Sequence, residues 1–121
     1  HNEQALITAR QNLDRIIAKK NSSCRCFFHT VSDAAWPDIP AAQLAYDIVV
    51  IDPPRQGIHE RALTYLGHAK IPRIHYISCN PATFVRDAKK LTALGYRFIE
   101  YRLFDFYPQT HHCELLGIFT R

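Results

Sequence analysis

The sequence has no long apolar run, no regular cysteine spacing and no secretory signal, and each absence narrows what the chain can be. No apolar run approaches the ~20 residues that a membrane-spanning helix needs. The four cysteines, Cys24, Cys26, Cys79 and Cys113, lack the spacing of a disulfide framework. No leader of the secretory type opens the chain. We therefore expect a soluble, cytoplasmic protein whose cysteines are reduced.

Charge is also modest. Fifteen basic residues stand against 11 acidic ones, which gives a formal net charge of +4. This balance permits a polyanionic partner, although it is common in proteins that never bind nucleic acid. With 121 residues, of which 47% are hydrophobic, the chain is expected to form one domain around one core.

The pattern of apolar residues predicts alternating strands and helices. The chain opens with a helical pattern over residues 1–20, with apolar residues at spacings of three and four. Because a natural chain seldom begins within a helix, we expect the C-terminal piece of a longer polypeptide. Strands are predicted at 24–31, 46–52, 73–78, 96–106 and 113–121, helices at 59–69 and 80–95, and loops at 32–45 and 107–112. This order is typical of an α/β sheet.

The strand at 46–52 and the strand at 73–78 each end in a residue that can do chemistry. The first has an unbroken apolar centre, which predicts a strand covered on both faces, and it ends in Asp52. The second is followed by Cys79, and the helix after it has Asn80 as its N-cap. In such sheets, ligands gather at the carboxyl ends of the strands.

Each of these residues also has a plain structural interpretation. The N–H groups at a helix N-terminus stabilise the thiolate form that a nucleophilic Cys79 would need, yet most such cysteines are inert core residues. Asp52 before a proline is a common loop opener, and Arg55 is explained equally well as a solvated charge. Glu114 stands at the start of an apolar strand. It is interpreted either as a partly desolvated carboxylate, as suits a general base, or as an edge-strand charge that discourages pairing with other strands.

A metal site is not predicted. Cys24 and Cys26 alternate with Phe27 as core residues do in a strand. Their combination with the run of His111, His112 and Cys113 lacks the ligand spacing of zinc sites.

Three motifs stand in order along the chain: DIVVIDPPRQG at 47–57, YISCNPATFVRD at 76–87 and LFDFYPQTHHCE at 103–114. Together they resemble the closing motifs of the S-adenosylmethionine-dependent RNA uracil-5-methyltransferases, which form 5-methyluridine in tRNA and ribosomal RNA. The opening helix and the 24–31 segment are also similar to that family. The resemblance implies a Rossmann-like class I methyltransferase sheet, here its C-terminal portion without the first two strands.

The resemblance also implies roles for individual residues. Cys79 is implied as the nucleophile that adds to C6 of uracil, and Glu114 as the base that removes the C5 proton. Asp52 is implied as a contact to the cofactor, S-adenosylmethionine, or to the catalytic loop, and Arg55 and Asn80 as residues that position that loop or the target base. The implied partner is tRNA or rRNA, and no metal is required.

The sequence lacks several features of the family pattern: the glycine-rich turn, the acidic residue that ends the second strand, the N-terminal RNA-binding module and the cysteine cluster that many members carry. The family's cofactor site begins with a glycine-rich turn, and none of the four glycines here stands in such a setting. We therefore expect the isolated chain to be inactive. The 24–31 strand would also lack its neighbours, so we expect it to be loosely attached or to pair with a second copy by strand exchange.

Two rival interpretations remain. The first is another class of methyltransferase, in which Asp-Pro-Pro followed by an aromatic residue serves amino-group methylation of nucleic acid bases. Here Arg55 stands in place of the aromatic residue. The other rival is an inactive fragment or paralogue that acts only as an RNA- or protein-binding module. The presence of both Cys79 and Glu114 favours the enzyme.

Overall fold

The computed structural model describes residues 3–20, 26–32, 34–110 and 112–121. The chain divides into two compact units, His1–Ser32 and Asp33–Arg121. No helix in the described part of either unit is long and apolar enough to cross a membrane.

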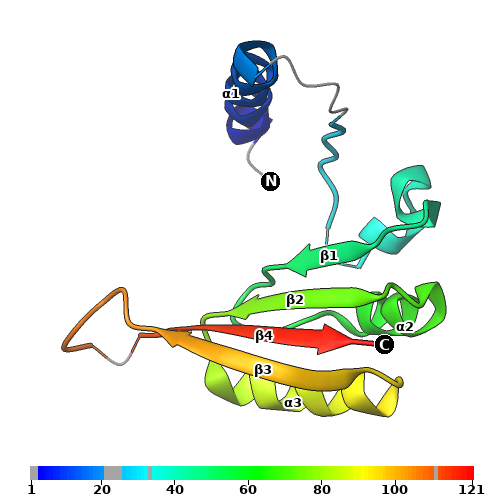
Figure 1. The fold of residues 1–121 in the computed structure, drawn as a ribbon, viewed down its shortest axis with the longest axis vertical. Helices are drawn as coiled ribbons and strands as arrows, with labels where there is room; N and C mark the ends of the chain where they lie inside the picture. Colours follow the sequence, from blue (N-terminus) through cyan, green and yellow to red (C-terminus); the bar gives the residue numbers. More distant parts are fainter. Residues whose placement is uncertain (1–2, 21–25, 33, 111) are drawn as a thin grey trace. The chain divides into compact units, whose positions relative to one another are not determined.

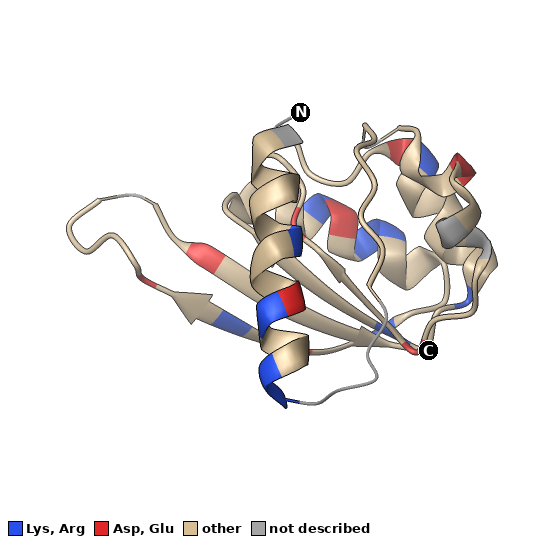
Figure 2. Cartoon of the chain, turned by 90° about the horizontal axis from the view of Figure 1, so that it is seen from above, with Lys and Arg blue, Asp and Glu red and all other residues tan. Residues whose placement is uncertain are grey.

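The first unit contains the predicted opening helix, α1 (Glu3–Lys20). Its most sheltered apolar residues, Leu6, Leu13 and Ile17, are half-buried and follow the predicted helical spacing. Lys19 and Lys20 lie in the last turn, where positive charge is favourable to the helix dipole. Basic residues outnumber acidic ones in the described part of this helix, where Asp14 stands among Arg10, Arg15, Lys19 and Lys20 (Figure 2).

The strand predicted at 24–31 is wrong for the residues that the structure describes. Residues 26–32 form neither helix nor strand, and Cys26 is half-buried. Cys24 lies outside the described residues. The physical reason is that a strand needs a hydrogen-bonded neighbour, and the described part of this unit contains no other strand. Strand exchange with a second copy stays a prediction.

The second unit is a four-stranded sheet with two helices (Figure 1). The strands are β1 (Ile48–Ile51), β2 (Arg73–Ser78), β3 (Arg97–Phe104) and β4 (Glu114–Thr120), in the spatial order β1-β2-β4-β3. β1 and β2 are parallel, and β4 runs antiparallel to β2 and β3 on either side of it. The helices α2 (Glu60–Ala69) and α3 (Pro81–Ala93) follow β1 and β2, as the sequence predicted.

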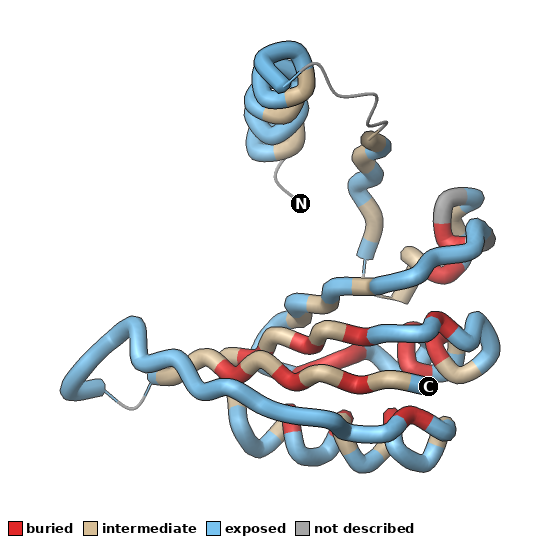
Figure 3. The backbone as a smooth tube through the Cα atoms, in the orientation of Figure 1, coloured by how far each residue is buried: buried red, intermediate tan, exposed pale blue. Residues whose placement is uncertain are grey.

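One face of this sheet carries the core. Alternate residues of β2 and β4 are buried, and the register pairs them across the strands, Ile74 with Phe119 and Ser78 with Leu115 (Figure 3). They join buried residues of α2 and α3, such as Leu66 and Leu91, in one cluster. The helices therefore cover this face of the sheet.

On the opposite face of the sheet β1 is exposed, and the prediction that both of its faces are covered is wrong for this unit. β1 was expected to be covered on both faces, but Ile48 is 47% and Val50 62% exposed. Only Val49 and Ile51 pack against the core. The apolar residues of β1 thus point alternately to both faces of the sheet. Within this unit the helices α2 and α3 cover only one of these faces.

The ends of the elements follow local sequence signals. The Asn80 side chain caps α3 by accepting a hydrogen bond from the backbone N–H of Ala82 at 3.0 Å, and Pro81 takes the first helical position. Gly95 stops the helix with a φ of +93°, a conformation that favours glycine. The loop predicted at 32–45 contains two short 3-10 helices, Trp36–Asp38 and Pro40–Gln43, each with a proline near its start.

Candidate active site

Three of the predicted site residues lie at one edge of the sheet. Asp52 directly follows β1, Cys79 directly follows β2 and Glu114 begins β4. Because β4 runs opposite to β1 and β2, its first residue lies at the same edge as their carboxyl ends (Figure 1). The sheet thus gathers a thiol and two carboxylates, as ligand sites of α/β sheets do.

The register of β2 and β4 brings Cys79 and Glu114 to corresponding positions. The last pair of this antiparallel ladder is Ser78 with Leu115. Cys79 directly follows Ser78, just beyond β2, and Glu114 directly precedes Leu115, so both residues adjoin the last pair of the ladder. Both are half-buried, and the Cys79 thiol is free. A thiol and a carboxylate therefore lie at the same end of two adjacent strands.

The backbone on both sides of Cys79 is fixed by hydrogen bonds. The Ser78 hydroxyl accepts from the N–H of Asn80 at 3.2 Å, and Ser78 itself is only 3% exposed. Asn80 caps α3, so the thiol stands beside the positive end of a 13-residue helix.

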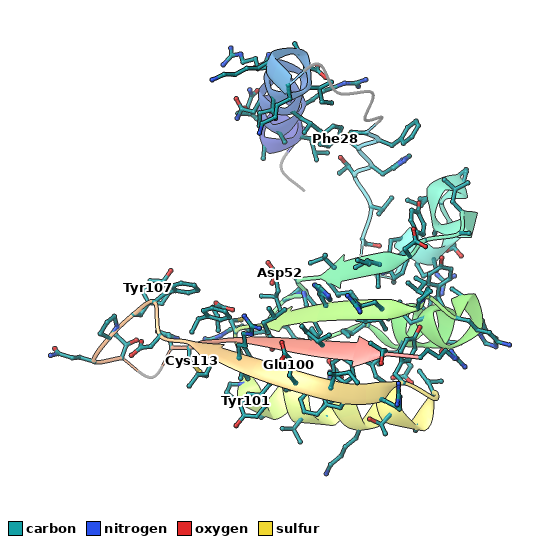
Figure 4. The ribbon with its side chains drawn as sticks, viewed as in Figure 1. Phe28, Asp52, Glu100, Tyr101, Tyr107 and Cys113 are labelled. Carbon is teal, nitrogen blue, oxygen red and sulfur yellow. The ribbon has the colours of Figure 1, made fainter. Side chains whose placement is uncertain are left out.

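Asp52 borders a pocket of about 300 Å³. It stands just beyond the carboxyl end of β1 (Figure 4). The pocket walls are mostly apolar, and the lining residues are Trp36, Val49, Val50, Ile51, Asp52, Pro53, Ile58, His59 and Ala62. A mostly apolar cavity lined by one carboxylate, one indole and one imidazole is a candidate small-molecule site.

Arg55 links the loop after β1 to two other segments of the site. Its carbonyl oxygen accepts a hydrogen bond from Nδ2 of Asn80 at 3.1 Å, so the structure brings these two predicted residues together. Its guanidinium Nη2 lies 3.1 Å from Nδ1 of His112, two residues before Glu114. Arginine has no acceptor, so His112 accepts through Nδ1 and its ring proton is on Nε2. Arg55 thus joins the segments that carry Cys79 and Glu114.

Sequence reasoning missed a buried carboxylate beneath this loop. Asp87 of α3 is 0% exposed. Its Oδ2 accepts from the N–H of Ile58 at 2.8 Å and from the Tyr76 hydroxyl at 3.0 Å. Burial raises the pKa of the Tyr76 phenol, and the neighbouring Asp87 carboxylate raises it further. Asp87 lies within the second of the three motifs, but a charged residue inside a helix gives no signal that it is buried.

Among the described residues, no group of three or more His, Cys, Asp or Glu side chains could hold a metal ion. Cys113 is half-buried and free, at the base of the loop that leads into β4 (Figure 4). His111 lies outside the described residues.

The arrangement defines a class of protein. A parallel strand pair with chemistry at its carboxyl ends, followed by an antiparallel last strand inserted between β2 and β3, is a Rossmann-like α/β layout of the kind that methyltransferases use. The chain belongs to the tRNA (uracil-5-)-methyltransferase family, whose model matches residues 25–121. The resemblance in the three motifs is thereby confirmed.

Relatives and a solved structure agree with this assignment. The chain is 40% identical over its whole length to an uncharacterized RNA methyltransferase of Treponema denticola, of which it covers 32%. It is 40% identical over 86% of its length to the 23S rRNA (uracil(1939)-C(5))-methyltransferase of Alcanivorax borkumensis, of which it covers 23%. The crystal structure of Pyrococcus abyssi tRNA (uracil-54, C5)-methyltransferase in complex with S-adenosyl-L-homocysteine matches 98% of this chain with a TM-score of 0.74 and 34% identity.

The methyltransferase fold is therefore confirmed. This chain covers 27% of that solved chain, so it spans about a third or less of the length of these relatives.

Proposed function

We propose that the whole protein is an RNA (uracil-5-)-methyltransferase that acts through a covalent bond between Cys79 and C6 of a uridine. The observation that supports the proposal is the β2–β4 register, whose last pair is Ser78 with Leu115, so that Cys79 and Glu114 both adjoin this pair, with Cys79 just before the N-terminus of α3. S-adenosylmethionine, bound beside Asp52, would supply a methyl group on a positively charged sulfur.

The chemistry explains why a thiol is needed. C5 of uracil is too poor a nucleophile to accept the methyl group directly. Addition of the Cys79 thiolate to C6 forms an S–C bond and moves the C5–C6 π electrons onto O4, which makes C5 an enolate carbon. C5 would then take the methyl group. The sulfur of S-adenosylmethionine would keep the electron pair of its broken bond to that methyl group.

The chemistry also explains why a carboxylate is needed. After methyl transfer C5 carries both a hydrogen and the new methyl group. Glu114 would take that proton, the C–H electrons would restore the C5–C6 double bond, and the S–C bond would break to return the Cys79 thiolate. Glu114 begins the strand next to β2. The hydrogen bond between Asn80 and Arg55 ties the loop after β1 to the residue that follows Cys79.

RNA is the proposed partner, either a tRNA or an rRNA. The target base must leave its stack to reach the thiol. The loop between β3 and β4 carries two exposed aromatic rings, Phe106 (64%) and Tyr107 (59%), on the segment that ends at Glu114. Exposed rings near a reactive site are suited to stack on unpaired bases.

The rival function, a module that binds RNA or protein without catalysis, is less well supported. Binding alone would need neither a thiol at a helix N-terminus nor a carboxylate beside it.

The test uses RNA in which 5-fluorouridine replaces uridine. Fluorine at C5 cannot leave as a proton, so the Cys79 adduct should persist on a denaturing gel when the full-length protein is incubated with this RNA and S-adenosylmethionine. Cys79→Ala should abolish the adduct, and Cys26→Ala, which removes a cysteine of the other unit, should leave it. The isolated chain of residues 1–121 is expected to form none. A full-length protein that binds the RNA and the cofactor but forms no adduct would contradict the proposal.

A further inference from the structure

The loop after Asp52 leaves few of its own backbone groups to hold it in place. Pro53 and Pro54 have no N–H, and the N–H of Gly57 donates to the carbonyl of Pro54 at 2.8 Å to close a tight turn. Three other backbone groups of the loop are hydrogen-bonded by side chains from outside it: the carbonyls of Arg55 and Gln56 and the N–H of Ile58.

Side chains from one helix satisfy all three. Asn80 Nδ2 donates to the Arg55 carbonyl, and Thr83 Oγ1 lies 3.2 Å from the same oxygen and 3.1 Å from the Asn80 carbonyl, so its single proton has two acceptors within reach. Arg86 Nη2 donates to the Gln56 carbonyl at 2.7 Å, and Asp87 Oδ2 accepts from the Ile58 N–H at 2.8 Å. Their positions are three and four residues apart, so they lie on one face of α3. We call Asn80, Thr83, Arg86 and Asp87 the α3 clasp.

Asp87, the buried member of the clasp, is itself held in place by hydrogen bonds. Asp87 is held by the Tyr76 hydroxyl from β2 and by Nε of Arg86, which donates to its Oδ1 at 2.8 Å. Gly57 passes so close that an added Cβ would lie 2.3 Å from Asp87 Oδ2, and its φ is +84°. A side chain at position 57 would therefore collide with the carboxylate that holds the loop.

The other end of the clasp adjoins Cys79. The helix that holds the Asp52–Ile58 loop begins two residues after the thiol, and Asn80 belongs to both its cap and the clasp. A single rigid element thus sets the position of the nucleophile and of the loop that carries Asp52 and Arg55.

We propose that Thr83, Arg86 and Asp87 are positioning residues that hold the Asp52–Ile58 loop in register with Cys79. This inference rests on the proposed function of the same site. None of the three needs to touch the RNA or the cofactor. Loss of one clasp bond lets the loop move relative to the thiol, and errors of the order of 1 Å in such positions cost up to about 100-fold in rate.

Thr83 offers the sharpest test because its hydroxyl can be removed without a change of shape. In the full-length protein, Thr83→Val should slow 5-fluorouridine adduct formation about tenfold at saturating RNA and S-adenosylmethionine. Thr83→Ser, which keeps the hydroxyl, should react within about twofold of the wild-type rate. Thr92→Val is the matched control, because Thr92 Oγ1 donates at 2.9 Å to the Ala88 carbonyl of its own helix, away from the loop.

Amide hydrogen exchange of a peptide spanning residues 53–58 gives a readout that does not depend on activity. Thr83→Val should speed this exchange, and neither Thr83→Ser nor Thr92→Val should. Wild-type adduct rates and unchanged exchange in Thr83→Val would overturn the positioning role, as would a Thr83→Ser variant as slow as Thr83→Val. No adduct from the wild-type protein would instead overturn the proposed function, and the positioning role with it.

Discussion

Nη2 of Arg55 donates to Nδ1 of His112 over 3.1 Å, and this contact ties the loop after β1 to the segment that enters β4. The backbone of the same arginine is held from α3. Arg55 is thus connected to the segment that follows Cys79 and to the segment that precedes Glu114, the two residues proposed to react.

The contact predicts a specific role for the His112 acceptor. His112→Leu should lower the rate of adduct formation about tenfold, the usual loss for a hydrogen bond to a charged group. His112→Asn should recover most of the rate, because its Oδ1 stands near the position of Nδ1. Single-turnover rates with 5-fluorouridine RNA measure the difference. Equal rates for the two variants would show that the acceptor is unimportant.

Glu114 should be needed after methyl transfer rather than before it. Glu114→Gln keeps the shape of the side chain but cannot take the C5 proton, so the RNA should stay bound to Cys79 even with ordinary uridine. A denaturing gel should reveal this adduct, and mass spectrometry should find the added methyl group in it. Glu100→Gln, on an exposed carboxylate paired with Arg102, is the control and should release its product. Normal release by Glu114→Gln would assign the base to another residue.

The exposed ring of Tyr107 should contribute to RNA binding. Stacking of one base on an aromatic side chain is worth about 1–3 kcal/mol, so Tyr107→Ala should weaken binding about tenfold in a titration at fixed salt. Tyr46→Ala removes another exposed tyrosine, 40% accessible and next to β1, and should bind RNA as the wild-type protein does. Equal affinity for all three proteins would place the RNA elsewhere.

Gly117 of β4 should tolerate no side chain. An added Cβ would lie 2.5 Å from Cζ of Phe84, whose ring is packed in the core, so Gly117→Ala should lower the free energy of unfolding by about 1–3 kcal/mol. Gly67→Ala is the comparison, because its Cβ would meet the mobile end of Leu94 and alanine favours a helix. Chemical denaturation measures both, and equal losses would contradict the explanation.

The raised pKa of Tyr76 predicts a loss of stability in alkali. A phenol whose pKa is higher in the folded than in the unfolded state stabilises the fold fully below about pH 10, its ordinary pKa. That contribution is lost as the pH rises above this value. The free energy of unfolding should therefore begin to fall as the pH rises through about 10 and should keep falling above it, and Tyr76→Phe should reduce the fall. An identical fall in the variant would assign it to other groups.

Much of the second unit follows from local sequence. The prolines, the Asn80 cap and Gly95 mark the ends of α3, and the apolar run at 73–78 coincides with β2. These signals act over a few residues, which is why they can be read from sequence. The strand expected at 24–31 failed for the opposite reason, since a strand depends on partners that local sequence does not specify.

The site was less accessible to such reasoning. Before any resemblance was considered, Cys79 and Glu114 each had a structural interpretation at least as good as a catalytic one. What joins them is the insertion of β4 beside β2, and no periodicity announces which strand pairs with which. The α3 clasp was missed because hydrogen bonds from a helix to a distant loop leave no repeating pattern.

The position of β4 has a consequence for how the protein is made. β4 follows β3 in the chain, yet it lies between β2 and β3 in the sheet. During synthesis β2 must wait for a segment about forty residues later before its second edge is paired, and such non-local pairing is slow. Cys79 therefore leaves the ribosome well before Glu114, and the two residues proposed to react reach the same end of the sheet only when β4 pairs with β2.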